Sequence, residues 1–202
     1  MLEQILFIII IIFSIIIHEV SHGYVAWRLG DNTARDAGRL SLNPLVHIDP
    51  VGTVIVPLVL YYTTGFAIGS AKPVPVNPHN FKDVRKGTLL VGLAGPLSNF
   101  LMALTLSILN NILPLPYILR YFLNSAAMIN LVLCFFNLIP IPPLDGSRVL
   151  AYFLNPKLAV SYLRLEPYGM IIVIILFYIG ILKYIILPFV YLSGALIGVR
   201  FI

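Results

Sequence analysis

The chain has 202 residues, of which 59% are hydrophobic and 10% are charged, and its mean hydropathy is +0.97. Because ordinary soluble domains are about 25% charged, this composition predicts a polytopic membrane protein without a sizeable soluble domain. The net charge of +5 does not indicate nucleic-acid binding, since the basic residues lie in short loops between apolar runs, where they set membrane topology. The single cysteine, Cys134, excludes an internal disulfide.

The first apolar run, Leu2 to Arg28, is predicted to form a membrane helix about 40 Å long. We expect no cleavable signal peptide, because the start of the chain carries Glu3 and no Lys or Arg. The run also lacks a small-residue cleavage site at its end. Near its C-terminal end, the run carries the motif His18-Glu19-Val20-Ser21-His22.

This motif has the pattern of half a zinc site. Residues four apart lie on one face of a helix, so His18 and His22 present two imidazoles to one point. Glu19 can then reach a water in the open position of the metal and act as a general base. The alternative is a chance match in a packed helix. Packing explains the motif poorly, because two histidines and a glutamate in an apolar helix would each need a polar partner.

Residues 29–86 are predicted to form a loop followed by a re-entrant, extended and β-like segment. His47 and Asp49 lie in the loop as potential ligands, but no helical spacing aims them at His18. The apolar run Val51 to Tyr62 is too short as a helix to span a bilayer core of roughly 30 Å. The proline-rich stretch that follows it, up to residue 78, indicates extended chain lying along or dipping into the membrane.

Two further core helices are predicted at residues 87–113 and 117–154. The first carries small residues that permit close helix packing, and its Asn99 can hydrogen-bond to a neighbouring helix. The second is broken by three prolines within 140–143, and such a break is tolerated at membrane depth only inside protein or along a cavity. Asp145 follows this break and is the best candidate for a third metal ligand. It can also serve as a helix N-cap.

Residues 169–202 are expected to form a C-terminal membrane segment, and the sequence leaves open whether 188–202 is a separate leg. The whole chain is thus expected to be a single all-α membrane domain with about four to six membrane helices. If residues 51–78 dip in and return, Asp145 reaches the same depth as the two histidines. Ten of the 13 basic residues then lie on that side of the membrane, which the positive-inside rule labels cytoplasmic.

The motifs HEVSH, GLAGPLSN and NLIPIPPLDG together resemble those of the site-2 protease family of intramembrane zinc metalloproteases, peptidase family M50. The resemblance covers nearly the whole chain and is to a minimal form without PDZ or CBS domains. It implies that His18, His22 and Asp145 hold one zinc ion and that Glu19 is the catalytic base. It also implies that Asn137, at the head of NxxPxPxLDG, holds an unwound substrate.

The expected function is hydrolysis of peptide bonds within or near transmembrane segments of membrane proteins. The expected substrate contacts are Asn137, Asn99, Val74 and Val76, the last two because the extended stretch can pair with a substrate as an added strand. The expected partners are a transmembrane protein substrate, the lipid bilayer and a regulatory membrane protein of unknown identity. The expected location is the cell membrane, as a multi-pass protein with its active site nearer the cytoplasmic side.

The alternative function is zinc binding or zinc transport without proteolysis. A transporter needs polar groups along a path through both leaflets. Here the acidic and histidine groups within apolar segments, His18, Glu19, His22 and Asp145, are predicted to gather at one depth, and binding alone does not need Glu19.

Overall fold

The computed structural model describes residues 2–55, 58–59, 62 and 71–199, and all regular elements in these ranges are helical. Three helices are long and apolar enough to cross a membrane: α1 (Leu2–Arg28), α4 (Val84–Ile112) and α5 (Tyr117–Asn137). A fourth span is formed if the bent pair α7 (Pro156–Leu163) and α8 (Glu166–Tyr178) is counted as one. The all-α polytopic membrane fold is confirmed, with three or four spans in the described residues against the four to six expected.

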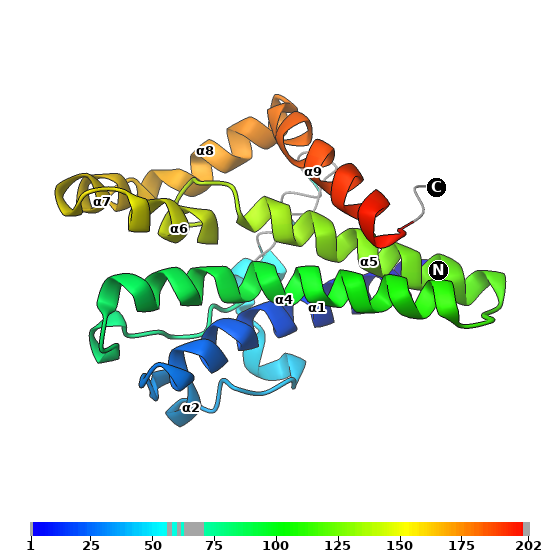
Figure 1. Ribbon diagram of the computed structural model, residues 1–202, viewed down its shortest axis with the longest axis horizontal. Coiled ribbons are helices and arrows are strands. Elements are labelled where there is room, and N and C mark those ends of the chain that lie inside the picture. Colours follow the sequence, from blue (N-terminus) through cyan, green and yellow to red (C-terminus); the bar gives the residue numbers. More distant parts are fainter. Residues whose placement is uncertain (1, 56–57, 60–61, 63–70, 200–202) are drawn as a thin grey trace.

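α4 packs against both α1 and α5, and the three helices form the centre of the molecule (Figure 1). Figure 1 shows that α1 ends, α4 begins and α5 ends at the same side of the bundle. Outward-facing residues of α1, among them Ile8 and Phe13, are exposed large hydrophobics. Such an apolar exterior is stable in lipid. The bundle therefore brings the end of α1 and the end of α5 to one depth, as the parity of the predicted spans requires.

The ends of the core helices follow local sequence signals. α1 is terminated at Gly30, whose φ of +106° is accessible to glycine. α4 begins at Asp83, whose side chain accepts a hydrogen bond from the Lys86 N–H at 2.9 Å. α5 begins after Pro116 and ends at Asn137, and the prolines that follow prevent its continuation.

The C-terminal segment expected over residues 169–202 consists of two helices. α8 and α9 (Ile181–Ile197) meet at Gly180, which has a φ of +77°. The chain therefore turns at Gly180, whereas residue 188, where the sequence left a separate leg open, lies inside α9. The positive φ of Gly180 is the physical reason for the turn, since most other residues avoid that conformation.

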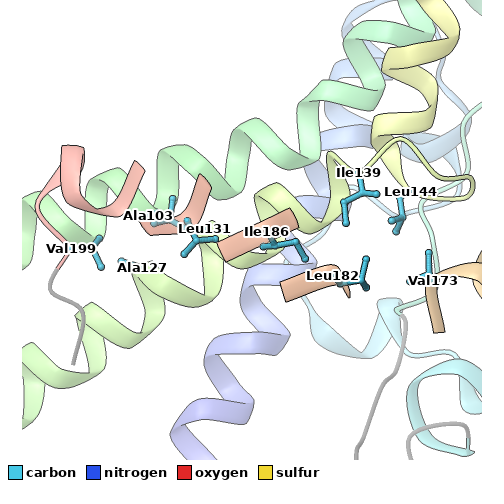
Figure 2. Packing of buried hydrophobic residues seen from close by; sticks show 10 residues of the cluster. Ala103, Ala127, Leu131, Ile139, Leu144, Val173, Leu182, Ile186 and Val199 are labelled. Carbon is cyan, nitrogen blue, oxygen red and sulfur yellow. The ribbon is translucent and has the colours of Figure 1, made fainter. Parts of the chain in front are cut away.

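The largest apolar cluster joins the C-terminal helices to the core bundle (Figure 2). Leu131 of α5 lies at its centre and is fully buried. Leu182 and Ile186 of α9 pack there together with Leu144, which lies just before α6 (Asp145–Phe153). This cluster fixes the chain on either side of the proline-rich break, and so it fixes where α6 begins.

Where the structure describes the segment between α1 and α4, it contains short helical elements and no strand. These are α2 (Thr33–Asp36), 3₁₀ turns at Pro44–His47 and Pro78–Asn80, and a π-helical turn at Pro50–Ile55. Residues 71–77 are extended without strand pairing among the described residues, and we call them the strap. The expected re-entrant course of Val51 to Pro78 falls partly outside the described residues.

The strap is tied at both ends to the loop that follows α1. At one end the Arg39 guanidinium donates to the Lys72 carbonyl at 2.6 Å. At the other end the fully buried Asp31 carboxylate accepts from the Asn77 N–H and from Asn80 Nδ2, each at 2.7 Å. Burial alone would raise the pKa of Asp31, but its hydrogen bonds, including those from Thr33, outweigh burial and hold the pKa below its usual value.

The arrangement predicts which loops share a membrane face. Single cysteines at Arg35 and Lys82, both exposed, should be labelled by an impermeant thiol reagent from the same face. A cysteine at Asn111, near the other end of α4, should be labelled from the opposite face. The buried Cys134 is replaced by alanine as the background. Labelling of Arg35 and Lys82 positions from opposite faces would contradict the fold.

Candidate active site

Three ligand atoms from two distant parts of the chain converge at one point. His18 and His22 lie on α1, and Asp145 is the first residue of α6. The Nε2 atoms of the two histidines are 3.1 Å apart, and each is 3.1 Å from Asp145 Oδ2. All three side chains are buried. The structure thus brings together the three residues expected from the sequence as metal ligands.

The outer nitrogen of each imidazole has a partner on α4. His22 Nδ1 lies 2.6 Å from the Val91 carbonyl oxygen, and His18 Nδ1 lies 2.6 Å from Asn99 Oδ1. Because a carbonyl oxygen can only accept, each Nδ1 must carry the proton. Each neutral ring therefore presents its Nε2 lone pair to the shared point, which is the form that binds a metal.

The donor set fits a zinc ion. Asp145 Oδ2 is buried and lies 3.1 Å from the Nε2 atoms of both histidines, so one carboxylate oxygen and two imidazole nitrogens face a single point. Ligands at zinc–ligand distances of about 2.0–2.1 Å in a tetrahedron are separated by roughly 3.3 Å, close to the 3.1 Å between these atoms. Three protein ligands leave the fourth position open, which is the arrangement of catalytic zinc sites.

Gly95 of α4 provides the space for this cluster. A Cβ built at Gly95 would lie 2.5 Å from His18 Nε2 and even closer to His22 Nε2. Nothing larger than hydrogen fits there unless the ligands move. The sequence suggests only that small residues on this helix permit close packing, whereas the structure shows that the close neighbours are the two imidazole rings.

The second oxygen of Asp145 is oriented by an arginine. Arg148 lies one turn later on α6, and its Nη1 is 3.3 Å from Asp145 Oδ1. This contact turns Oδ2 towards the histidines. The capping role considered for Asp145 is not observed, because Leu144 is the N-cap of α6 and Asp145 is its first helical residue.

Glu19 lies beside the ligand cluster and is held by the strap. Its Oε2 accepts a hydrogen bond from the Val74 N–H at 2.9 Å. The side chain is partly exposed, because it faces a cavity of about 710 Å³ that the three ligands also line. The expected base is therefore placed at the border between the ligands and the space available for a substrate.

The cavity contains three of the four residues expected to contact substrate. Val74 and Val76 of the strap form part of its wall, and Asn137 at the end of α5 forms another part. Asn99 does not line the cavity. Its side chain is fully buried behind His18, so the structure places it as a partner of a ligand and not as a substrate contact.

The two other ligands considered from the sequence lie apart from this cluster. His47 Nε2 donates to the Ser41 carbonyl at 2.7 Å, and Asp49 accepts from the Gly52 N–H at 2.6 Å. Within the described residues, the grouping of His, Cys, Asp and Glu that could hold a metal is His18, His22 and Asp145. Sequence reasoning assigned no site role to Asn130, Gly95 or Arg148. Asn130 has a signal in the sequence, since it is an amide in the middle of an apolar helix, between Asn124 and Asn137.

Comparison with known proteins agrees with this geometry. The sequence profile of peptidase family M50 matches residues 115–180. YwhC of Bacillus subtilis, named as a candidate zinc metalloprotease, is 36% identical over 190 residues, covering 90% of this chain and 84% of YwhC. Rip2 of Mycolicibacterium smegmatis, also named as a candidate zinc metalloprotease, is 31% identical over 168 residues, covering 81% of this chain and 62% of Rip2.

A more distant relative is the zinc metalloprotease MJ0392 of Methanocaldococcus jannaschii, which is 28% identical over 153 residues, covering 76% of this chain and 35% of MJ0392. No solved structure matches the chain. The family is a peptidase family, and the three relatives are named as zinc metalloproteases or candidates for that role, so the expectation of a zinc metalloprotease is confirmed. With the extent of the match to YwhC, the chain belongs to peptidase family M50, the site-2 protease family of zinc metalloproteases.

Proposed function

We propose that this protein cleaves peptide bonds within or near transmembrane segments of other membrane proteins, with one zinc ion bound per chain by His18, His22 and Asp145. The observation that carries the proposal is the position of the ligands. Two of them lie on α1, a helix with the length and composition of a membrane span, and all three are buried. Burying ionisable groups in a membrane-spanning helix costs free energy, so such groups usually mark a functional site.

The chemistry follows from the residues around the cluster. When bound, zinc supplies an acidified water and polarises the substrate carbonyl. Glu19 accepts the proton of the water as its oxygen adds to the carbonyl carbon. Glu19 then delivers that proton to the amide nitrogen as the carbon–nitrogen bond breaks. Asn99, the Val91 carbonyl and Arg148 hold the three ligands in place throughout.

A substrate helix must be extended before it is cut, because its carbonyls are otherwise held in its own hydrogen bonds. The strap offers an edge for such an extended peptide. Pro73 and Pro75 lack N–H groups, so within 73–76 only Val74 and Val76 can donate. Val74 currently donates to Glu19, and pairing at this residue requires Glu19 to exchange that contact. Asn137, which also lines the cavity, supplies a further polar contact.

The proposed location is the cell membrane, with the site nearer the cytoplasmic side. The loop after α1 and the start of α4 lie at the end of the bundle where the ligands are (Figure 1). These regions carry the basic residues Arg35, Lys82 and Lys86. The excess of Lys and Arg in loops at this end supports a cytoplasmic assignment by the positive-inside rule.

The ligand set predicts a sharp contrast between two carboxylates. Asp145→Ala should lose bound zinc, from about one ion per purified chain to almost none, because only two ligands remain. The matched control, Asp49→Ala, removes a carboxylate that accepts a hydrogen bond from the Gly52 N–H in its own turn and should keep its zinc. Metal analysis of both purified variants checks this. Retention of zinc by the first and loss by the second would show that the third ligand is assigned wrongly.

The lack of space at Gly95 predicts that adding a single methyl group there weakens zinc binding. Gly95→Ala should weaken zinc binding by roughly 10–100-fold or more, the range seen when groups that orient ligands are altered. The control is Gly92→Ala, one turn earlier on α4. A Cβ at Gly92 would lie 3.0 Å from Arg148 Cβ and 3.3 Å from the backbone carbonyl oxygen of Asp145. These contacts are looser than those at Gly95 and involve none of the three ligand atoms. Equal zinc affinities for the two variants, measured by chelator competition, would contradict the steric account.

The role of Glu19 predicts that binding and catalysis can be separated. Glu19→Gln keeps size and hydrogen bonding but removes basicity, so zinc should remain while cleavage of a transmembrane substrate in detergent falls about 10²–10⁴-fold. Zinc content and cleavage are measured on the same preparation. Cleavage near the wild-type rate with zinc retained would remove Glu19 from the mechanism. Loss of zinc would make it a ligand or ligand partner instead.

A further inference from the structure

Behind His18, away from the cavity, a chain of buried amides crosses the three core helices. Asn99 of α4 and Asn130 of α5 are both fully buried and hydrogen-bonded to each other at 2.8 Å. Ser14 of α1 contacts both, through its carbonyl oxygen and its hydroxyl. Neither Asn130 nor Ser14 touches a ligand atom or lines the cavity. The proposed mechanism uses Asn99 as the partner of His18 and gives Asn130 and Ser14 no task.

The direction of the hydrogen bonds in this chain is fixed at its far end. Asn130 Nδ2 lies 2.9 Å from the carbonyl oxygen of Ala126, one turn earlier in α5. A backbone carbonyl can only accept, so the amide of Asn130 must present its nitrogen there. The second hydrogen on that nitrogen reaches Ser14 Oγ at 2.9 Å. The oxygen of the Asn130 amide is therefore left facing Asn99.

The orientation of the Asn130 amide fixes that of the Asn99 amide, which in turn fixes the proton position on His18. Because Asn130 Oδ1 accepts, Asn99 must present its Nδ2, whose other hydrogen reaches the Ser14 carbonyl at 3.3 Å. Asn99 Oδ1 then faces His18 Nδ1 at 2.6 Å and can only accept from it. The proton of the neutral His18 ring is thereby held on Nδ1. Its Nε2 lone pair is left for the metal.

The opposite orientation would disable the site. With the Asn99 amide reversed, an N–H would face His18 Nδ1, and the ring would carry its proton on Nε2 instead. That proton would point at Asp145 Oδ2, 3.1 Å away, and exclude a metal. His22 does not need such a chain, because the carbonyl of Val91 fixes its Nδ1 proton directly. The two ligands on one helix thus obtain the same tautomer by different means.

We propose that Asn130 is a positioning residue for the metal site: acting through Asn99, it sets the tautomer of His18 from a position that touches no ligand. The inference rests on the zinc site proposed above. It deepens that proposal by identifying what keeps His18 competent to bind zinc. Partners of ligand imidazoles typically change metal affinity by about 10–100-fold when they are removed.

The test is a double-mutant cycle on the full-length chain in detergent, with zinc affinity measured by chelator competition. Asn130→Leu and Asn99→Ala should each weaken zinc binding by about 10-fold or more. The double variant should be no weaker than Asn99→Ala alone, because Asn130 acts only through Asn99. Wild-type zinc affinity in Asn130→Leu, or additive effects in the double variant, would overturn the proposal.

A control variant and a second measurement distinguish the proposed role of Asn130 from a general loss of folded protein. Ser107→Ala removes another buried hydrogen bond of α4, from the hydroxyl to the Ile197 carbonyl at 2.7 Å, and should bind zinc as the wild type does. In the zinc-loaded wild type, nitrogen-15 histidine spectra should show His18 bound to the metal through Nε2, with its proton on Nδ1. Binding of the metal through Nδ1 of His18 would overturn the proposal without any variant. Loss of zinc from Asp145→Ala, by contrast, tests the zinc site itself.

Discussion

The packing of α4 against α1 is the contact on which the active site depends. Three positions of α4, spaced four residues apart, face the ligand helix. Val91 supplies a carbonyl, Gly95 supplies space and Asn99 supplies an amide. In a membrane protein an unsatisfied polar group is expensive, so two imidazoles can lie within an apolar helix only if a neighbouring helix completes their hydrogen bonds. The HExxH helix and α4 are therefore a single functional unit, although they are separated by more than 50 residues of chain.

The position of Asp145 depends on two glycines, Gly146 and Gly169, that lie close to the backbone of the proline-rich bend. A Cβ at Gly146 would lie within 2.7 Å of the Ile139 carbonyl oxygen, and one at Gly169 would overlap the Pro142 carbonyl. The proline-rich bend is thus enclosed by two glycines, one at the start of α6 and one in α8. With the apolar cluster around Leu144, these contacts leave the bend little freedom. The carboxylate can then meet the histidines without a supporting strand or sheet.

The sequence predicted the parts of this site that follow from local spacing. Helical periodicity is enough to pair His18 with His22. The parity of the apolar runs brings Asp145 to their depth if residues 51–78 dip into the membrane and return. It could not predict that Asn99 faces His18, because periodicity does not say which neighbour a helix face meets. Nor could it identify the contribution of Val91, since every residue has a carbonyl. The contact of Asn130 with Ser14 spans 116 positions of sequence, and only the assembled bundle reveals it.

The hydrogen bonds of the strap connect Glu19 to the loop that follows α1. Arg39 and Asp31, which anchor the two ends of the strap, both belong to the loop that follows α1. Between them, one hydrogen bond joins Val74 to Glu19. A displacement of this loop by about 1 Å is enough to lengthen that bond beyond hydrogen-bonding distance. The Glu19 carboxylate is thus mechanically connected through the strap to the loop that follows α1.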